Sequence, residues 1–121
     1  MTEENLALRI SRLLYNKKAE DVLALRVAHL TVLTDYLVLC TGHNAIQVRA
    51  LTEHLEEQLS LLGHFPRRVE GKNDGTWVVM DYQNVIVHIF KPEARGYYRL
   101  ERLWEDGQNR MDLPFIKEAE E

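Results

Sequence analysis

The chain has 121 residues, a length that fits one domain whose core needs no disulfide or metal for stability. Its net charge is −4 and it has no basic stripe, so we expect little direct nucleic-acid binding and favour a basic protein as partner. The single cysteine, Cys40, excludes an internal disulfide, and without a long apolar run no membrane span is expected, so the sequence predicts a soluble, cytoplasmic protein.

The first third of the chain predicts a helix followed by two strands. Apolar residues at helical spacing near the N-terminus predict a helix that ends near Asn16. Residues 21–27 and 36–41 are expected to be strands, and the second is apolar throughout, as in a strand covered on both faces. We expect Leu30 and Leu33 to anchor the loop between them.

The clearest helix follows Gly42. Asn44 is a plausible N-cap with Gln47 three residues later, and Gly63 is where the helix should stop. Its apolar face is expected to contain Val48, Leu51, Leu55, Leu59 and Leu62. A strand, a glycine turn, a helix and a return to strands indicate a crossover, so we expect a mixed sheet in an α+β fold.

Residues 70–104 organise the rest of the chain. A short strand is expected around Val69, and two runs rich in β-branched residues, 76–80 and 85–90, predict a hairpin across a polar turn. A symmetric turn would place Met80 opposite Val85, Val78 opposite Val87, Thr76 opposite Ile89, Trp77 opposite His88 and Val79 opposite Ile86. One face of this hairpin is aliphatic and belongs in the core, whereas the face with Trp77 and His88 is mixed. Either a helix covers the mixed face, or the face meets a partner.

The C-terminal part predicts one more helix and a tail. Pro92 ends the last strand, and residues 93–103 are expected to form a helix with Leu100, Leu103 and Trp104 on its apolar side. Residues 107–121 form an acidic tail, for which a frayed terminus is the simpler interpretation. Residue types that anchor protein interfaces, namely Trp77, Tyr82, Arg95, Tyr97, Tyr98 and Trp104, gather near one edge of the expected sheet.

Motifs for catalysis are incomplete. Gly71-Lys72 lacks the flanking residues of a phosphate-binding loop, and Asp81 has Gln83 where a second metal-binding carboxylate would stand. The five histidines lack the spacing of paired helical metal ligands, and Cys40 has no basic neighbour. We therefore expect no enzyme, no catalytic residue, no metal and no cofactor. A nucleotidyltransferase-like phosphotransfer enzyme and a homodimeric interaction scaffold remain as alternatives.

Several ordered motifs resemble one family. They are TDYLVLCTG from Thr34, Gln47-Val48, EG at Glu70, GTWVVMDYQNVIVHIF from Gly75 and PEARGYYRLERLW from Pro92. Together they are similar to the Iojap or ribosomal silencing factor family, and the resemblance spans residues 19–106. It implies a single-domain α/β sandwich with a mixed sheet and flanking helices, similar to nucleotidyltransferases but without the catalytic acids.

The same resemblance implies a function without covalent chemistry. Family members bind the large ribosomal subunit through its protein fourteen, block subunit joining and repress translation when nutrients are scarce. Carried over by position, it implies that the partner-binding residues are Trp77, Asp81, Tyr82, His88, Tyr97 and Tyr98, with Glu70 and Arg95 as charged partners. The corresponding domain would be residues 1–106.

Overall fold

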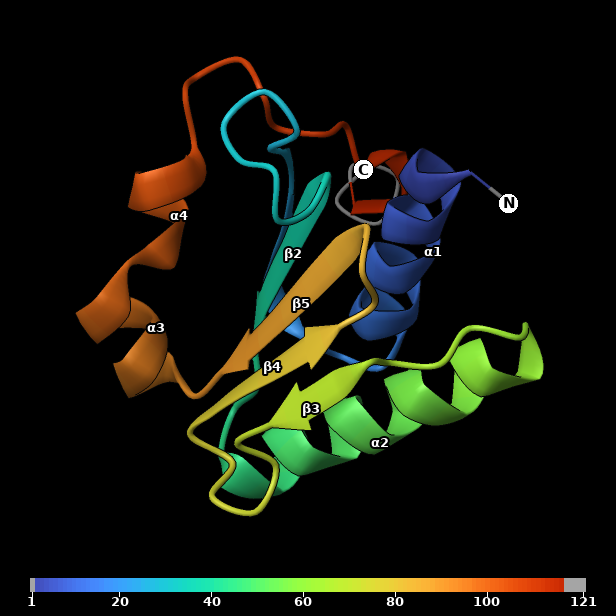
Figure 1. The fold of residues 1–121 in the computed structure, drawn as a ribbon. Coiled ribbons are helices and arrows are strands. Elements are labelled where there is room, and N and C mark those ends of the chain that lie inside the picture. The colour runs from blue at the N-terminus through green and yellow to red at the C-terminus, as the bar shows by residue number, and fades with distance from the viewer. Residues whose placement is uncertain (1, 117–121) are drawn as a thin grey trace.

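The computed structural model describes residues 2–116 and shows a five-stranded sheet between two pairs of helices (Figure 1). In chain order the elements are α1 (Glu3–Asn16), β1 (Glu20–Arg26), β2 (Tyr36–Thr41), α2 (Ala45–Leu61), β3 (Arg68–Glu70), β4 (Trp77–Asp81), β5 (Val85–Phe90), α3 (Pro92–Tyr98) and α4 (Leu100–Trp104). No helix within residues 2–116 is both long and apolar enough to cross a membrane.

The sheet is mixed, as expected. Its strand order is β1-β2-β5-β4-β3, in which only the β2–β5 pair is parallel. A parallel pair requires a crossover, and the chain from β2 to β5 runs through α2, β3 and β4. The expected single α+β domain with a mixed sheet and flanking helices is confirmed.

Each face of the sheet has its own apolar cluster. The larger cluster joins α1 and α2 to one face and contains, among others, Val38, Val78 and Met80. The smaller cluster lies on the opposite face, where Ala94 of α3 packs with Leu39 and other alternate residues of β1, β2 and β5. Because successive side chains of a strand point to opposite faces, β2 is buried on both sides, which explains its continuous apolar run.

The ends of the first two helices follow their sequence signals. Thr2 Oγ1 accepts a hydrogen bond from Asn5 N–H at 3.1 Å, and Asn44 Oδ1 accepts one from Gln47 N–H at 2.9 Å. Gly63, with φ 83°, follows the end of α2 in the left-handed conformation that glycine tolerates. The predicted boundaries of both helices are confirmed.

The register of the β4–β5 hairpin differs from the symmetric prediction by two residues. The observed partners are Trp77–Phe90, Val78–Ile89, Val79–His88, Met80–Val87 and Asp81–Ile86. The cause is a tighter turn, in which Gln83 has φ 74° and Asn84 N–H donates to Tyr82 C=O at 3.0 Å, forming a γ-turn. A shift of two keeps every side chain on its predicted face, so Trp77 and His88 still share one side.

The expected helix over residues 93–103 is two short helices. Arg99 lies between α3 and α4 with φ 47° and ψ 49°, a left-handed conformation that no helix interior contains. Leu100 and Trp104 pack against the smaller apolar cluster, as expected, whereas Leu103 is 75% exposed. The helical spacing misassigned Leu103 because the break at Arg99 rotates the second segment.

Two irregular segments also differ from expectation. Leu30 and Leu33 do not anchor the 28–35 loop, because they are 45% and 71% exposed; backbone hydrogen bonds hold the loop instead. In the C-terminal segment Met111 is buried and its N–H donates to Ala24 C=O at 2.8 Å, so residues 109–113 cover the free edge of β1 rather than fray. Residues 117–121 of the expected tail lie outside the described part.

Candidate partner-binding face

The mixed face of the β4–β5 hairpin is only partly covered. The small helices α3 and α4 lie over β1, β2 and the end of β5, on the left of the sheet in Figure 1. Four outward residues of the hairpin, Trp77, Val79, Ile86 and His88, remain partly accessible. The alternate residues of both strands are fully buried against α1 and α2. The hairpin therefore presents one half-buried surface of rings and aliphatic groups.

Trp77 is the centre of this surface. Its Nε1–H donates to His88 Nδ1 at 3.0 Å, and its ring stacks on Phe90 with centroids 5.1 Å apart. Phe90 is its cross-strand partner and His88 its diagonal neighbour, both within reach of an indole. The hydrogen bond and the stacking fix the orientation of the indole before any partner arrives.

His88 is a neutral histidine with a defined tautomer. Burial lowers the pKa of His88 to about 4, because the charged imidazolium would lose its hydration. Since Nδ1 accepts the indole hydrogen bond, the ring proton must sit on Nε2. Nε2 has no hydrogen-bond partner within residues 2–116, so it is a donor left for a group outside the chain.

Two tyrosines of α3 extend the surface. Tyr98 is 50% exposed and lies 4.7 Å from Trp77 between ring centroids, and Tyr97, 81% exposed, meets Tyr98 edge to face at 5.0 Å. We call Trp77, His88, Phe90, Tyr97 and Tyr98 the aromatic cluster. Large rings with polar edges, partly exposed and held in place by one another, are typical of the residues that dominate protein interfaces.

Two of the expected charged residues lie on the same face of the sheet as this cluster. Asp81 occupies the same face of β4 as Trp77, where its carboxylate pairs with Arg67 at 3.1 Å and accepts Gln83 N–H at 2.7 Å. Its first effect is thus to stabilise the turn of the hairpin. Glu70 is exposed on the edge strand β3 and pairs with Arg68 at 3.2 Å.

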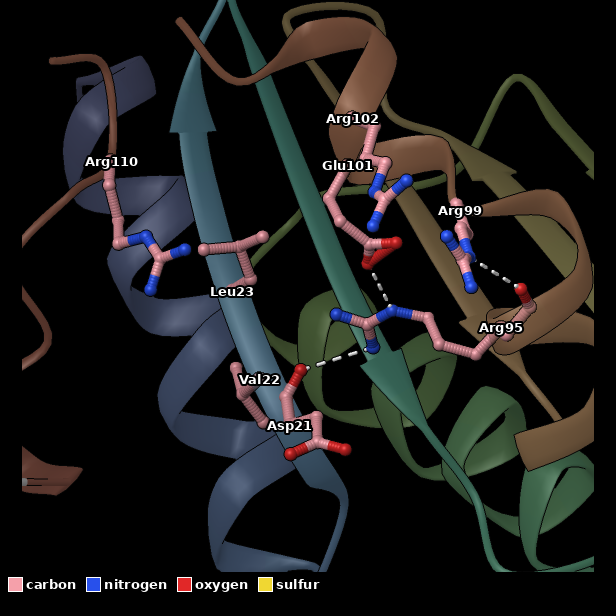
Figure 2. A pocket seen from close by; sticks show the side chains of 9 residues that line it. Asp21, Val22, Leu23, Arg95, Arg99, Glu101, Arg102 and Arg110 are labelled. Atoms are coloured by element: carbon pink, nitrogen blue, oxygen red, sulfur yellow. Dashed lines mark hydrogen bonds and ion pairs between the residues drawn. The ribbon is translucent and has the colours of Figure 1, made fainter. Parts of the chain in front are cut away.

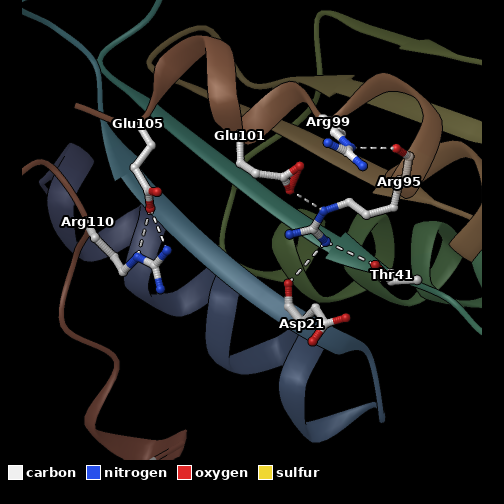
Figure 3. Close-up of polar contacts among 8 residues, drawn as sticks. Asp21, Thr41, Arg95, Arg99, Glu101, Glu105 and Arg110 are labelled. Atoms are coloured by element: carbon white, nitrogen blue, oxygen red, sulfur yellow. Dashed lines mark hydrogen bonds and ion pairs between the residues drawn. The ribbon is translucent and has the colours of Figure 1, made fainter. Parts of the chain in front are cut away.

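Tyr82 and Arg95 lie elsewhere. Tyr82 is only 7% exposed, in the larger apolar cluster, and burial raises the pKa of its hydroxyl, which has no hydrogen-bond partner among residues 2–116. Arg95 points to the other side of α3, where its guanidinium pairs with Glu101 at 2.6 Å and donates to the Asp21 carbonyl and Thr41 Oγ1 (Figure 3). The structure does not bring either side chain to the aromatic cluster.

The structure adds Phe90 to the predicted set. The sequence identified it only as the end of a strand, but its fully buried ring is the platform on which Trp77 stacks. The available signal was its place on the same face as Trp77, two residues after His88. Within residues 2–116, no group of three or more His, Cys, Asp or Glu side chains could hold a metal ion.

Comparisons with known proteins agree on one family. A family model described as "Ribosomal silencing factor during starvation" matches residues 1–121. The ribosomal silencing factor RsfS of Bacillus subtilis is 36% identical over 91 residues, which is 75% of this chain and 77% of that protein. The RsfS of Haemophilus influenzae is 36% identical over 87 residues, 72% of this chain and 85% of the relative.

More distant relatives and solved structures extend the likeness. A mouse protein named "Mitochondrial assembly of ribosomal large subunit protein 1" is 29% identical over 98 residues, 76% of this chain but 42% of that protein. A crystal structure of a Chromobacterium violaceum protein superposes with a TM-score of 0.84 at 28% identity, covering 93% of this chain and 96% of the other. A Bacillus halodurans structure gives a TM-score of 0.78 at 32% identity, covering 93% and 100%.

Proposed function

The chain belongs to the ribosomal silencing factor family, and we propose that it represses translation by binding the large ribosomal subunit and blocking subunit joining when nutrients are scarce. The proposed contact is protein fourteen of the large subunit, and the proposed place of action is the cytoplasm. The name of the mouse relative, which refers to the large ribosomal subunit, supports the choice of subunit.

The observation that carries this proposal is the aromatic cluster. All of its rings except the buried Phe90 are exposed enough to touch a partner, and they are ordered in advance by the Trp77–His88 hydrogen bond and the stacking on Phe90. Preorganised rings lose little conformational entropy on binding, which favours their use as anchors. The cluster supplies the surface for a steric blocker and needs no reacting group.

Within this proposal the expected site residues take different roles. Tyr97, Tyr98 and the edge of Trp77 make the contact, and His88 offers its Nε2–H. Asp81 keeps the hairpin turn in place, and Glu70 supplies negative charge at the neighbouring edge for a basic partner. Tyr82 and Arg95 support the fold and are not contacts.

We propose no catalytic role. The nucleotidyltransferase-like alternative would need at least two carboxylates around a magnesium ion, and the carboxylate of Asp81 is instead held by Arg67. The homodimer alternative uses the same rings and is separated from the proposal by measurement.

Tyr97→Ala tests the proposed contact. Because Tyr97 is 81% exposed in the free chain, its removal should leave the stability of the fold nearly unchanged. In the proposed complex the partner buries this ring, so its loss should weaken binding by about 1–2 kcal/mol, or roughly tenfold. Binding is measured by sedimentation of the labelled protein with purified large subunits through a sucrose gradient. Phe65→Ala is the matched control, since Phe65 is also an exposed ring, 69% accessible, in the loop between α2 and β3.

The blocking step is measured separately. Separated subunits are mixed with each of the three proteins, and the formation of whole ribosomes is followed by light scattering. We expect the unaltered chain and Phe65→Ala to slow joining and Tyr97→Ala to have lost this effect. Full affinity in folded Tyr97→Ala would refute the contact, and tight binding without slower joining would refute the blocking mechanism.

A further inference from the structure

A second surface feature is a hollow between β1, α3 and α4. Its lining is positively charged, whereas the chain as a whole is acidic. Its volume is about 530 Å³ (Figure 2). The lining residues are Asp21, Val22, Leu23, Arg95, Gly96, Arg99, Glu101, Arg102 and Arg110. Four arginines and two acidic residues give the lining an excess of two positive charges, in a chain whose net charge is −4. We call this feature the arginine hollow.

Arg95 forms the fixed wall of the arginine hollow. Its side chain is 14% exposed, and its Nε and Nη1 are held by Glu101, the Asp21 carbonyl and Thr41 (Figure 3). This ion pair neutralises the charge of Glu101, the only acidic side chain that α4 contributes to the lining. The remaining terminal nitrogen, Nη2, has no hydrogen-bond partner within residues 2–116. One preoriented guanidinium edge is therefore available.

Two of the other three arginines make fewer contacts. Arg102 makes no side-chain hydrogen bond or ion pair within the described chain, and Arg99 donates only to the Gly96 carbonyl at 3.2 Å. Arg110 is paired with Glu105, a residue outside the lining, through both Nε at 2.9 Å and Nη2 at 2.5 Å. Figure 2 shows Arg95, Arg99 and Arg102 on one side of Leu23 and Arg110 on the other. Guanidinium groups thus border the apolar floor formed by Leu23 from two sides.

The strained junction of the two short helices produces this grouping. Arg99 adopts φ 47°, a conformation that is costly for a residue with a side chain, and it ends α3 so that α4 starts in a new direction. A continuous helix would place residues 95, 99 and 102 along one straight stripe. The break instead folds Glu101 back onto Arg95 and leaves Arg102 at the rim.

We propose that the arginine hollow binds a phosphate group. A terminal phosphate offers three acceptor oxygens and up to two negative charges, which suits several guanidinium groups better than a single carboxylate does. A nucleic-acid backbone offers two oxygens and one charge at each of several successive phosphates. The volume exceeds that of one phosphate, so the group can be part of a larger molecule. The source is either a small phosphorylated molecule or the backbone of an RNA, and the inference does not depend on the proposed contact with the large subunit.

The test uses the whole chain, labelled with nitrogen-15, and inorganic pyrophosphate as the probe. Arginine Nε–H resonances are followed by NMR during a titration at constant ionic strength. We expect saturable shifts of Arg95 and Arg102. Arg102→Gln should weaken the apparent affinity by about tenfold, the loss of one charge-assisted hydrogen bond, while an unchanged backbone spectrum shows that the variant is folded.

Arg9→Gln is the matched control. It removes the same charge from an exposed arginine on α1, against the opposite face of the sheet, that has no ion pair within residues 2–116. It should leave pyrophosphate binding unchanged. Shifts that do not saturate, or that are equal in Arg102→Gln and Arg9→Gln, would overturn the proposal and indicate general electrostatic attraction.

Two further titrations identify the source of the phosphate. A short oligouridylate that shifts the same resonances at lower concentration than pyrophosphate would support an RNA backbone, and pyrophosphate binding without oligouridylate binding would support a small molecule. A glutamate-rich peptide that binds the hollow more tightly than either would overturn the phosphate assignment. Because no ribosome is present, failure of this site and failure of the proposed function are told apart.

Discussion

At the residue scale, the Trp77–His88 pair links burial, protonation and the shape of the partner-binding face. His88 can accept the indole N–H only while Nδ1 is unprotonated. Burial penalises the charged imidazolium and lowers the pKa of His88 from 6.5 to about 4. Protonation at Nδ1 would also break the hydrogen bond with Trp77. The neutral imidazole is therefore part of the folded structure.

This coupling predicts a stability loss in mild acid. Because the pKa of His88 is lower in the folded than in the unfolded state, the unfolded chain binds more protons between pH 6.5 and about 4. The contribution of His88 is present above pH 6.5 and lost as the pH falls, by about 2 kcal/mol between pH 7 and pH 5. Urea unfolding at both pH values measures it.

His88→Gln is the control for this measurement, because glutamine can still accept the indole N–H but does not titrate. We expect the free energy of unfolding of the variant to fall by about 2 kcal/mol less over the same pH interval. Parallel pH profiles in the two proteins would show that His88 is not the responsible group.

The sequence predicted the faces of individual residues better than their partners. Trp77 and His88 were placed together because alternation along a strand does not depend on register. Tyr82 and Arg95 were misplaced because their types suggest an interface, while their surroundings come from distant segments, α2 for Tyr82 and β1 for Arg95. Residue type alone carries no information about such long-range contacts.

At the element scale, the loop from β3 to β4 sets the position of Trp77. Gly71 has φ 85°, and a Cβ there would lie 2.1 Å from the Trp77 carbonyl oxygen. Only glycine allows both the left-handed backbone and this close approach.

Gly71→Ala should therefore destabilise the protein beyond the conformational penalty alone. Gly107→Ala is the matched control, since Gly107 has φ 88° but nothing within 4 Å of a built Cβ. We expect the free energy of unfolding to fall by about 1 kcal/mol in the control and by at least about 2 kcal/mol more in Gly71→Ala, as measured by thermal unfolding. Equal losses would mean that the loop moves away without cost.

Other elements differ in how far local sequence determines them. The caps of α1 and α2 are local, and both helices were predicted with their ends. The break at Arg99 is not signalled by glycine or proline at that position, and the Arg95–Glu101 ion pair that accompanies it joins residues six apart. For the same reason the arginine hollow, built from β1, both short helices and Arg110, was not predictable from spacing.

At the scale of the whole molecule, the mixed topology followed from two features of the sequence, the doubly apolar β2 and the helical crossover after it. The C-terminal segment that covers β1 could not be predicted from the sequence. Residues 109–113 join a strand more than eighty residues earlier through backbone hydrogen bonds that any sequence can make. The result is a molecule with one face closed by α1 and α2 and the other closed only in part. Surface for binding is left beside the short helices.

This arrangement predicts that self-association and ribosome binding compete. The aromatic cluster is the surface where exposed and half-buried rings contact one another, so a second copy of the chain would use the same surface that we propose for the large subunit. We expect the average mass from light scattering to rise with concentration for the unaltered chain and Phe65→Ala, to stay monomeric for Tyr97→Ala, and to fall when the isolated ribosomal partner is added in excess. A dimer that persists in Tyr97→Ala, or that the ribosomal partner leaves intact, would place self-association on another surface. A monomer at every concentration would eliminate the scaffold alternative, and ribosome binding would remain as the proposed role of the aromatic cluster.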